Sequence, residues 1–243
     1  MLARPRGPVG RWRTQARHLF WVLLRDRVGP LLRAEGFGGA GQSWRLEHPS
    51  GNAALIQVQR SRWNTADSVQ FTINLAVASK VVWDWQLTRE PGRGPAARPS
   101  ALYANDCPLW RRIGAGLGGD GWWTITTGMR LEPVAASVVE ALHGRAIPLL
   151  GDHLTDAALC QWLDDPQLGW PTDPWRLIYL SVLLATHGPN RRLDQILEQL
   201  QARVADDPRP PWLAEHVTDM RQRALTAAGG GACAARPPNT NPG

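Results

Sequence analysis

The sequence contains few cysteines, and their spacing is uninformative. Its 243 residues include only Cys107, Cys160 and Cys233, which lie far apart and form no C-x-x-C pair. An odd number of widely spaced cysteines argues against a disulfide framework and against a structural zinc site. A chain of this length buries about 70–75% of its unfolded surface and needs no covalent staples. We therefore expect a protein of a reducing, cytoplasmic setting, with no metal and no cofactor.

Long apolar runs are also absent. The stretch HLFWVLL (residues 18–24) is apolar for only a few residues before Arg25, Asp26 and Arg27. A membrane-spanning helix needs about 20 apolar residues, and a secretory signal needs a longer apolar region with a cleavage site. We expect no membrane segment.

Lysine is nearly missing, because Lys80 is the only lysine among 27 basic residues. A bias toward arginine, tryptophan, glycine and proline is typical of a GC-rich bacterial genome, so the net charge of +6 carries little functional weight. The charge is nevertheless uneven, since residues 1–62 hold eleven arginines against three carboxylates. A basic arm over residues 1–11 could hold nucleic acid. A solvated, disordered leader explains it better.

Residues 55–77 form the most regular pattern in the chain and predict two strands around a polar turn. The even-numbered Ile56 and Val58 and the odd-numbered Phe71, Ile73 and Leu75 alternate with polar residues. These apolar side chains are expected to point into one core. Pairing Arg60 with Val69 would place Gln59 opposite Gln70 and Gln57 opposite Thr72.

The opposite face of this hairpin carries amides and hydroxyls instead of charges. Asparagine is depleted in strands, so Asn74 needs a compensating reason. Amides supply both donors and acceptors, and the adjoining turn adds a guanidinium and an indole. We predict a ligand-binding face made of Gln57, Gln59, Ser61, Arg62, Trp63, Asn64, Gln70, Thr72 and Asn74. Alternatively, the protein's own chain covers this face and satisfies the amides internally.

The rest of the chain predicts an α+β fold: an N-terminal helix packed on a mainly antiparallel sheet of about four strands, followed by a helical C-terminal region. The first helix, over residues 12–35, should kink or break at Gly29-Pro30 and stop at Gly36. The strands are expected at 43–48, 53–60, 69–77 and 121–127, with a loop at 61–68 and an irregular segment at 86–109. Helices are expected at 131–147, 154–164, 174–187, 191–205 and 210–226. As domains, we expect a disordered basic arm (1–11), an α+β domain (12–150), a helical extension (151–226) and a disordered tail (227–243).

Three motifs with possible chemistry are weak. GAGLGG (114–119) matches a dinucleotide fingerprint, but the residues after it predict a strand where a helix is required. His153 and Asp156 could share a helical face and hold a metal, although helix capping explains them as well. Four carboxylates flank the irregular segment and could act as a paired acid and base if folding gathers them. These are Asp84, Glu90, Asp106 and Asp120.

Several of these motifs together resemble a known family. PLLRAEGF (30–37), Gly41, Trp44, QRSRWN (59–64), FTINLAV (71–77), RRIG (111–114) and the pair Trp122-Trp123 are similar in order and spacing to the domain of unknown function 4304. The resemblance covers about residues 14–150. Arg60 stands where the family commonly has lysine, and Ala76 where it commonly has glycine. The resemblance implies a shared fold and supplies no mechanism.

We therefore hypothesise a non-catalytic binding or interaction module that engages a peptide or protein partner with the polar sheet face and the adjoining turn. The first alternative is a hydrolase-like enzyme with carboxylates from segment 84–120. The second is nucleic-acid binding through the arginine-rich arm, which we rank last.

Overall fold

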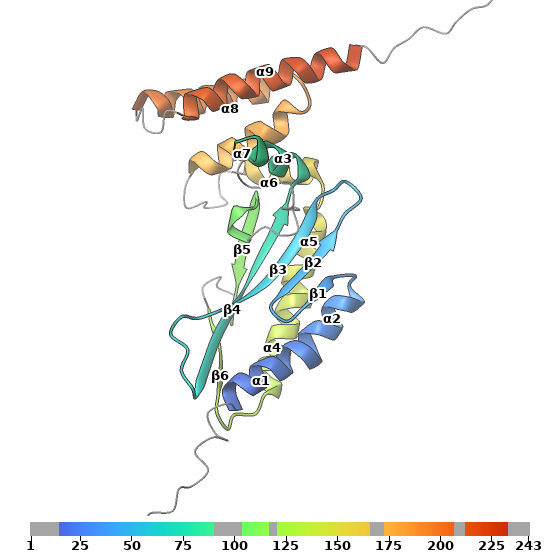
Figure 1. Cartoon of the computed structure of the whole chain (residues 1–243), viewed down its shortest axis with the longest axis vertical. Coiled ribbons are helices and arrows are strands. Elements are labelled where there is room, and N and C mark those ends of the chain that lie inside the picture. The colour runs from blue at the N-terminus through green and yellow to red at the C-terminus, as the bar shows by residue number, and fades with distance from the viewer. Residues whose placement is uncertain (1–14, 90–103, 117–120, 166–172, 207–211, 233–243) are drawn as a thin grey trace, which may run out of the picture. The chain divides into compact units, whose positions relative to one another are not determined.

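The computed structural model of the chain describes residues 15–89, 104–116, 121–165, 173–206 and 212–232 (Figure 1). They form two compact units. The first contains the described residues up to Lys80 and those from 104 to Thr155. The second contains residues 81–89 and those from Asp156 onward. Within these ranges, no helix has the length and apolarity needed to cross a membrane. The predicted arm 1–11 lies outside the described residues. The tail predicted to be disordered from residue 227 is helical as far as Ala232.

The first unit contains a six-stranded antiparallel sheet, which confirms the predicted α+β class. The strands follow the order β1 to β5, and β6 pairs with the free part of β4. Their bounds are β1 Gly38–Ala40, β2 Ser43–Glu47, β3 Ala53–Arg60, β4 Ser68–Ala78, β5 Leu109–Ile113 and β6 Trp123–Thr126. The sequence pattern missed β1 and β5. Gly-Gly-Ala carries almost no side-chain signal, and Leu-Trp-Arg-Arg-Ile does not alternate.

The pairing of β3 with β4 confirms the predicted interior but corrects the predicted register. Ile56 lies opposite Leu75, and both are buried. Arg60 pairs with Phe71 instead of Val69, so Gln59 faces Thr72 across the strands. A shift of two residues keeps every side chain on its expected face, because strand side chains alternate with period two. The shift arises at the turn, where the Ser61 N–H donates to the Gln70 carbonyl (2.8 Å) and closes the hairpin two residues later than predicted.

Two long helices on the same sheet each contain a π-helical turn directly before a proline. The first runs as α1 (Gln15–Leu23), the turn Leu24–Val28 and α2 (Gly29–Ala34). The second runs as α4 (Glu132–Ala141), the turn Leu142–Ala146 and α5 (Ile147–Asp152).

The prolines explain both turns, and the helix shows its predicted irregularity near Gly29-Pro30 as a π turn, without a break. A proline has no N–H, and its ring crowds the carbonyl four residues earlier. In the π turn, the residue before each proline donates one step further back, from Gly29 to Leu24 and from Ile147 to Leu142. The second helix therefore continues to Asp152, beyond the predicted end at 147. Past the end of α2, Gly36 adopts φ +84°, as expected of a glycine stop.

The helices cover one face of the sheet. In the first unit, α1 and α5 contact β4, α2 contacts β1, and α4 contacts β6. An aromatic cluster forms the centre of this layer: the ring of Phe71 lies 5.3 Å from Phe20 and 5.6 Å from Trp123. All three side chains are buried. The N-terminal helix therefore packs on the sheet as predicted.

Asn52 is a buried polar residue that joins three segments of the first unit. Its side chain donates to the Leu154 carbonyl (3.0 Å) and accepts from the Lys80 N–H (2.9 Å), while only 1% of the residue is exposed. It thus ties the β2–β3 turn to the end of β4 and to the segment after α5. Because a buried polar group is costly without partners, this residue holds the three segments in one arrangement.

The second unit is helical, with α3 (Lys80–Arg89), α6 (Asp156–Asp164), α7 (Asp173–Ala185), α8 (Arg191–Asp206) and α9 (Trp212–Ala232). The last four match the predicted helices. The pattern missed α3, because its valines and tryptophans face every direction and give no helical stripe. Within this unit, the Trp85 ring packs edge-on against Tyr179, which places α3 on α7.

A buried Ser181–His216 pair connects α7 to α9. Ser181 Oγ donates to the Ile178 carbonyl (2.8 Å) and lies 2.8 Å from His216 Nε2. The Nε2–H must therefore be the donor, which leaves Nδ1 as an acceptor without a partner in the described residues. Ser181 is fully buried, so its hydroxyl cannot reach a substrate. Burial, followed by the nearby Arg89 charge, lowers the pKa of His216 to about 4.

Replacing Asn52 with alanine should destabilise the first unit by about 2–3 kcal/mol, because the Leu154 carbonyl and the Lys80 N–H lose their partner in the interior. Urea unfolding of the full chain measures this change. Gln70→Ala is the control: Gln70 is exposed, and its loss should change stability by less than about 0.5 kcal/mol. Equal midpoints for the two variants would contradict the role given to Asn52.

The stability of the second unit should fall as the pH drops from about 6.5 toward 4. The unfolded chain binds a proton at His216 in this window and the folded chain does not, so the contribution of His216 is complete above pH 6.5 and is lost toward pH 4. The full effect is about 3 kcal/mol. Unfolding curves at several pH values should show the stability difference between wild type and His216→Gln shrinking across this window. A difference that stays constant across this window would contradict the role given to His216.

Candidate functional site

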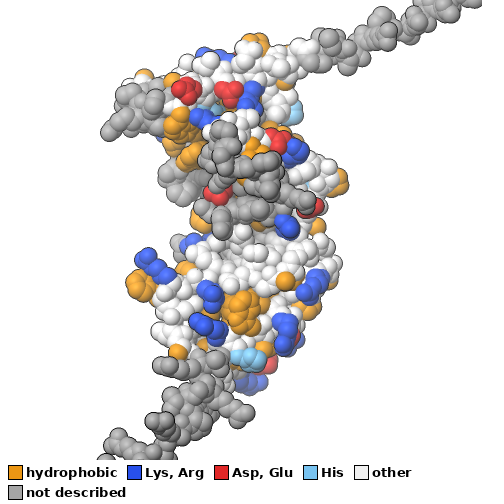
Figure 2. All heavy atoms as spheres, viewed as in Figure 1, with side chains coloured by type: hydrophobic (Ala, Val, Ile, Leu, Met, Phe, Trp, Pro, Cys, Tyr) orange, Lys and Arg blue, Asp and Glu red, His pale blue; other side chains and the backbone are white. Residues whose placement is uncertain are grey.

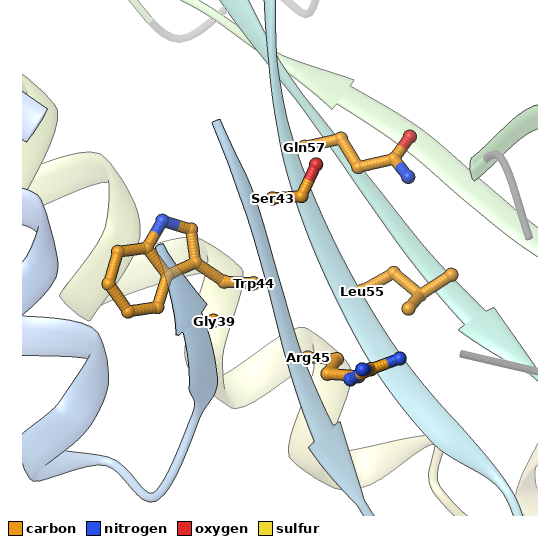
Figure 3. A pocket seen from close by; sticks show the side chains of 6 residues that line it. All are labelled: Gly39, Ser43, Trp44, Arg45, Leu55 and Gln57. Atoms are coloured by element: carbon orange, nitrogen blue, oxygen red, sulfur yellow. The ribbon is translucent and has the colours of Figure 1, made fainter. Parts of the chain in front are cut away.

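The face of the sheet turned away from the helices carries the polar residues that the sequence singled out. Figure 3 shows Trp44 pointing toward the helices, while Ser43, Leu55 and Gln57 point to the other side. The register continues this outer face across the sheet, since Gln57 pairs with Asn74 and Asn74 with Arg112. Amide, hydroxyl and guanidinium groups of four strands thus lie side by side.

Part of this outer face is covered by the protein's own chain. The 3-10 turn Ala104–Asp106 packs on β3, β4 and β5, and the Ala104 N–H donates to Gln57 Oε1 (3.1 Å). Leu55 and Cys107 are buried there. A shallow hollow of about 220 Å³ remains next to Gln57, lined by Gly39, Ser43, Trp44, Arg45 and Leu55.

Thr72 belongs to the covered part as well. Its hydroxyl donates to the Ile113 carbonyl (2.8 Å), and the residue is fully buried. This hydrogen bond fixes the end of β5 against β4. Thr72 and Gln57 therefore stabilise the fold with the polar groups that were predicted to bind a ligand. For these two residues, the alternative holds that the protein's own chain covers the face.

Arg112 organises the middle of the outer face. Its Nε lies 3.4 Å from Asn74 Oδ1, and its Nη2 lies 3.4 Å from Gln59 Oε1. Asn74 Nδ2 also donates to Gln59 Oε1 (2.8 Å). These hydrogen bonds compensate for the low strand preference of asparagine. Asn74 links an amide and a guanidinium from the two neighbouring strands. Gln59 remains exposed at the end of this network.

Two indoles surround the Arg112 guanidinium, which lies 5.6 Å from the ring centre of Trp110 and 6.0 Å from that of Trp122. Its neighbour Arg111 points to the opposite face, across from Leu75, where partial burial lowers its pKa. Neither Arg112 nor Trp110 is among the residues predicted from the sequence to bind a ligand. The RRIG motif (111–114) is the sequence feature that could have pointed to Arg112. Only the pairing of β5 with β4 places Arg112 on the outer face.

The hairpin tip between β3 and β4 is the open part of the outer face. Trp63 is 74% exposed, the most exposed large apolar side chain among the described residues. The Arg62 guanidinium lies 4.8 Å above its ring, and the Trp63 N–H donates to Ser61 Oγ (3.1 Å). Gln70 is exposed on the strand that leaves the tip. The tip therefore presents an indole, a guanidinium and free amide groups together.

Asn64 holds this tip in shape. Its Oδ1 accepts from the Gln70 N–H (2.7 Å), and its Nδ2 donates to the Gln70 carbonyl (3.2 Å). A side chain that pairs with both backbone groups of one residue replaces a rung of the sheet. Asn64 is thus a structural residue of the turn that carries Trp63.

The other candidate groups are not brought together. Asp84 lies in α3 and Asp106 in the 3-10 turn of the other unit, while Glu90 and Asp120 lie outside the described residues. His153 follows the end of α5 and Asp156 begins α6, so the two do not share one helical face as the metal reading required. Within the described ranges, no group of three or more histidine, cysteine, aspartate or glutamate side chains is arranged to hold a metal ion.

The cysteine and glycine motifs also have structural explanations. Burial raises the pKa of the Cys107 thiol far above its usual range and that of Cys160 to about 11, so both stay protonated at neutral pH.

In GAGLGG, a Cβ on Gly114 would lie 1.6 Å from the Gly121 carbonyl oxygen. The backbones of Gly114 and Gly121 therefore approach each other closely, residues 117–120 lie outside the described residues, and β6 follows as the predicted strand.

The surface of the first unit is mainly basic. On the face seen in Figure 2, arginine and lysine side chains are more frequent than carboxylates over this unit. On the outer sheet face and tip, Arg45, Arg62 and Arg112 stand against Glu47 and Asp67. The site is therefore suited to neutral or acidic groups.

A six-stranded antiparallel sheet, backed on one face by two π-kinked helices and polar on the other, defines the class of this α+β unit. The family model for the domain of unknown function DUF4304 matches residues 28–152, and the chain belongs to this family. No curated protein and no solved structure matches the chain. The match ends where the first unit ends and covers the whole outer face.

Asn64→Ala should destabilise the hairpin by about 1–2 kcal/mol, because the Gln70 N–H loses its partner and the Gln70 carbonyl keeps only the Ser61 N–H. Trp63→Ala should change stability by less than about 0.5 kcal/mol, since this side chain is mostly exposed. Denaturant unfolding of both variants checks the contrast. A larger loss for Trp63→Ala than for Asn64→Ala would mean that the indole serves the fold.

Proposed function

We propose that the first unit is a non-catalytic binding module, which engages a peptide or protein partner with the open hairpin tip and the adjoining polar strands. The observation that carries this proposal is the 74% exposure of Trp63 at the tip of a well-ordered turn. An indole buries about 150–250 Å² when it is covered, and tryptophan and arginine are the residues most enriched at interface hot spots. Trp63 is thus an anchor whose apolar surface the fold itself leaves open.

The surroundings of the indole support binding. Asn64 fixes the turn in the free protein, so little conformational entropy is lost when a partner packs on Trp63. Arg62 stands over the ring with its N–H groups available for a carboxylate or carbonyl. Gln59 and Gln70 offer amide groups on the two strands that lead into the tip. An extended segment with an apolar residue and a nearby acidic residue fits this combination.

The network inward of the tip positions these groups. Gln59 is held by Asn74 and Arg112, and the two indoles at Arg112 keep its guanidinium in place. Of the residues predicted to bind a ligand, the proposal assigns contact to Gln59, Arg62, Trp63 and Gln70. It assigns support to Gln57, Ser61, Asn64, Thr72 and Asn74.

The two alternative functions lack a favouring observation. Of the four carboxylates that flank segment 84–120, Asp84 and Asp106 belong to different units, and Glu90 and Asp120 lie outside the described residues. The arginine-rich arm lies outside the described residues.

A random peptide library displayed on phage and selected on the full-length protein tests the proposal. Peptides enriched on wild type should bind in solution, and Trp63→Ala should weaken them by about 30-fold, the effect of a 2 kcal/mol hot spot. Circular dichroism and unfolding should remain unchanged. Trp21→Ala is the matched control, because Trp21 is an exposed indole on α1, 42% accessible, and should leave binding intact. The absence of enriched peptides, or equal binding by both variants, would refute the module.

A further inference from the structure

The Arg112 guanidinium on the outer sheet face has no carboxylate partner among the described residues. Its Nε lies 3.4 Å from Asn74 Oδ1 and its Nη2 lies 3.4 Å from Gln59 Oε1, and both distances are longer than those of a typical N–H···O hydrogen bond. The third nitrogen, Nη1, has no hydrogen-bond partner in the same ranges. Two neutral amide oxygens therefore leave the positive charge of Arg112 uncompensated.

The carboxylates of the outer face and tip do not neutralise Arg112. Glu47 lies on β2, Asp67 in the hairpin loop and Asp106 in the 3-10 turn. Within the described part of the chain, none of the three forms an ion pair with this guanidinium. Arg62 at the tip has no ion pair in these ranges either. The outer face therefore carries two guanidiniums that rest against indoles and have no carboxylate partner there.

Next to Arg112, the indole N–H of Trp110 is a further donor without a partner. Trp110 and Arg112 occupy successive outward positions of β5, since they pair with Ala76 and Asn74 of β4. Nε1 of Trp110 is buried and makes no hydrogen bond to any described residue. A buried donor without an acceptor is unfavourable and rare in native proteins. A carboxylate has the negative charge and the two acceptor oxygens that these neighbouring donors lack.

The surroundings of Arg112 favour a carboxylate in a defined orientation. The guanidinium lies between two indoles, 5.6 Å from the ring centre of Trp110 and 6.0 Å from that of Trp122. Contacts on its flat faces leave its N–H donors in the guanidinium plane, where they pair with both oxygens of a carboxylate. Arg112 is half-buried, and its contact with Gln59 lies on the exposed side of the network, toward the tip. A partner that covers Trp63 can therefore continue to Arg112 along the same face.

We propose that the partner of the first unit is an acidic peptide segment, in which one aspartate or glutamate pairs with Arg112 while an apolar residue packs on Trp63. This inference rests on the proposed binding function and adds the chemical class of the partner. A polyanion such as nucleic acid fits less well, because Glu47 and Asp67 stand on the same face and tip and oppose its further charges.

A random peptide library displayed on phage, selected in parallel on full-length wild type and on Arg112→Gln, tests this inference. Peptides enriched on wild type should carry an aspartate or glutamate at a fixed spacing from an apolar residue. Peptides enriched on Arg112→Gln should keep the apolar residue and lose the fixed acid. Circular dichroism of the variant checks that the sheet remains folded.

A synthetic copy of an enriched peptide, and the same peptide with its acid replaced by the amide, then measure the pairing by titration. Wild type should bind the amide form about tenfold more weakly, the loss of one charged hydrogen-bonded contact. Arg112→Gln should bind both forms equally, because the cycle isolates the pair. The preference of wild type should shrink as salt is raised. The comparison of the two peptides on wild type holds even if the variant is poorly folded.

Arg17→Gln is the matched control, since it removes an equal charge from the exposed side of α1, the helix on the other face of the sheet. It should keep the full preference for the acidic peptide. Peptides that depend on Trp63 but show no preference for the acid, or a preference that persists in Arg112→Gln, would overturn the acidic partner and leave the binding module standing. A wild type that enriches no peptide overturns both. Tighter binding of a short oligothymidine than of the peptides, lost in Arg112→Gln, would assign the site to nucleic acid instead.

Discussion

The antiparallel pairing of β3 with β4 is the constraint on which the first unit depends. The two strands pair along eight residues, and this register decides which side chains meet the helices and which form the outer face. On the inner side it aligns Ile56 with Leu75 and places Phe71 between Phe20 and Trp123. On the outer side it aligns Gln57 with Asn74, to which β5 adds Arg112. A slip by one residue would exchange the two faces, whereas the two-residue shift at the turn leaves both intact.

The outer face divides its polar groups between structure and exposure. The Thr72 hydroxyl donates to β5, and the Gln57 side chain accepts from the 3-10 turn. Asn74 joins Gln59 to Arg112. Only toward the tip do polar groups and a large indole remain open. The uncharged polar face of the central strands is therefore largely paired within the protein. Its remaining exposed amides lie near Trp63.

Arginine against indole is the recurring local arrangement in both units. Arg33 lies over Trp44, Arg62 over Trp63, Arg112 beside Trp110 and Trp122, and Arg89 over Trp85 and Trp212. Composition explains why these residue types are common in the chain. Position gives them different roles, because Trp44 is buried under the helices while Trp63 is open. The same pair of residues therefore serves packing in one place and leaves donors free in another.

The amino-acid pattern was sufficient to predict the α+β class, the two faces of the β3–β4 hairpin, the helix irregularity at Gly29-Pro30 and most C-terminal helices. These features depend on local rules: alternation in strands, helical periodicity and the missing N–H of proline. Tertiary contacts were needed to set the register, to add β1 and β5 and to place α3 in the helical unit. They also bring the neighbouring side chains to Arg112, Arg89 and His216. Those depend on which segments distant in sequence pair and pack. A side chain's neighbours across strands or helices leave no periodic signal in its own segment.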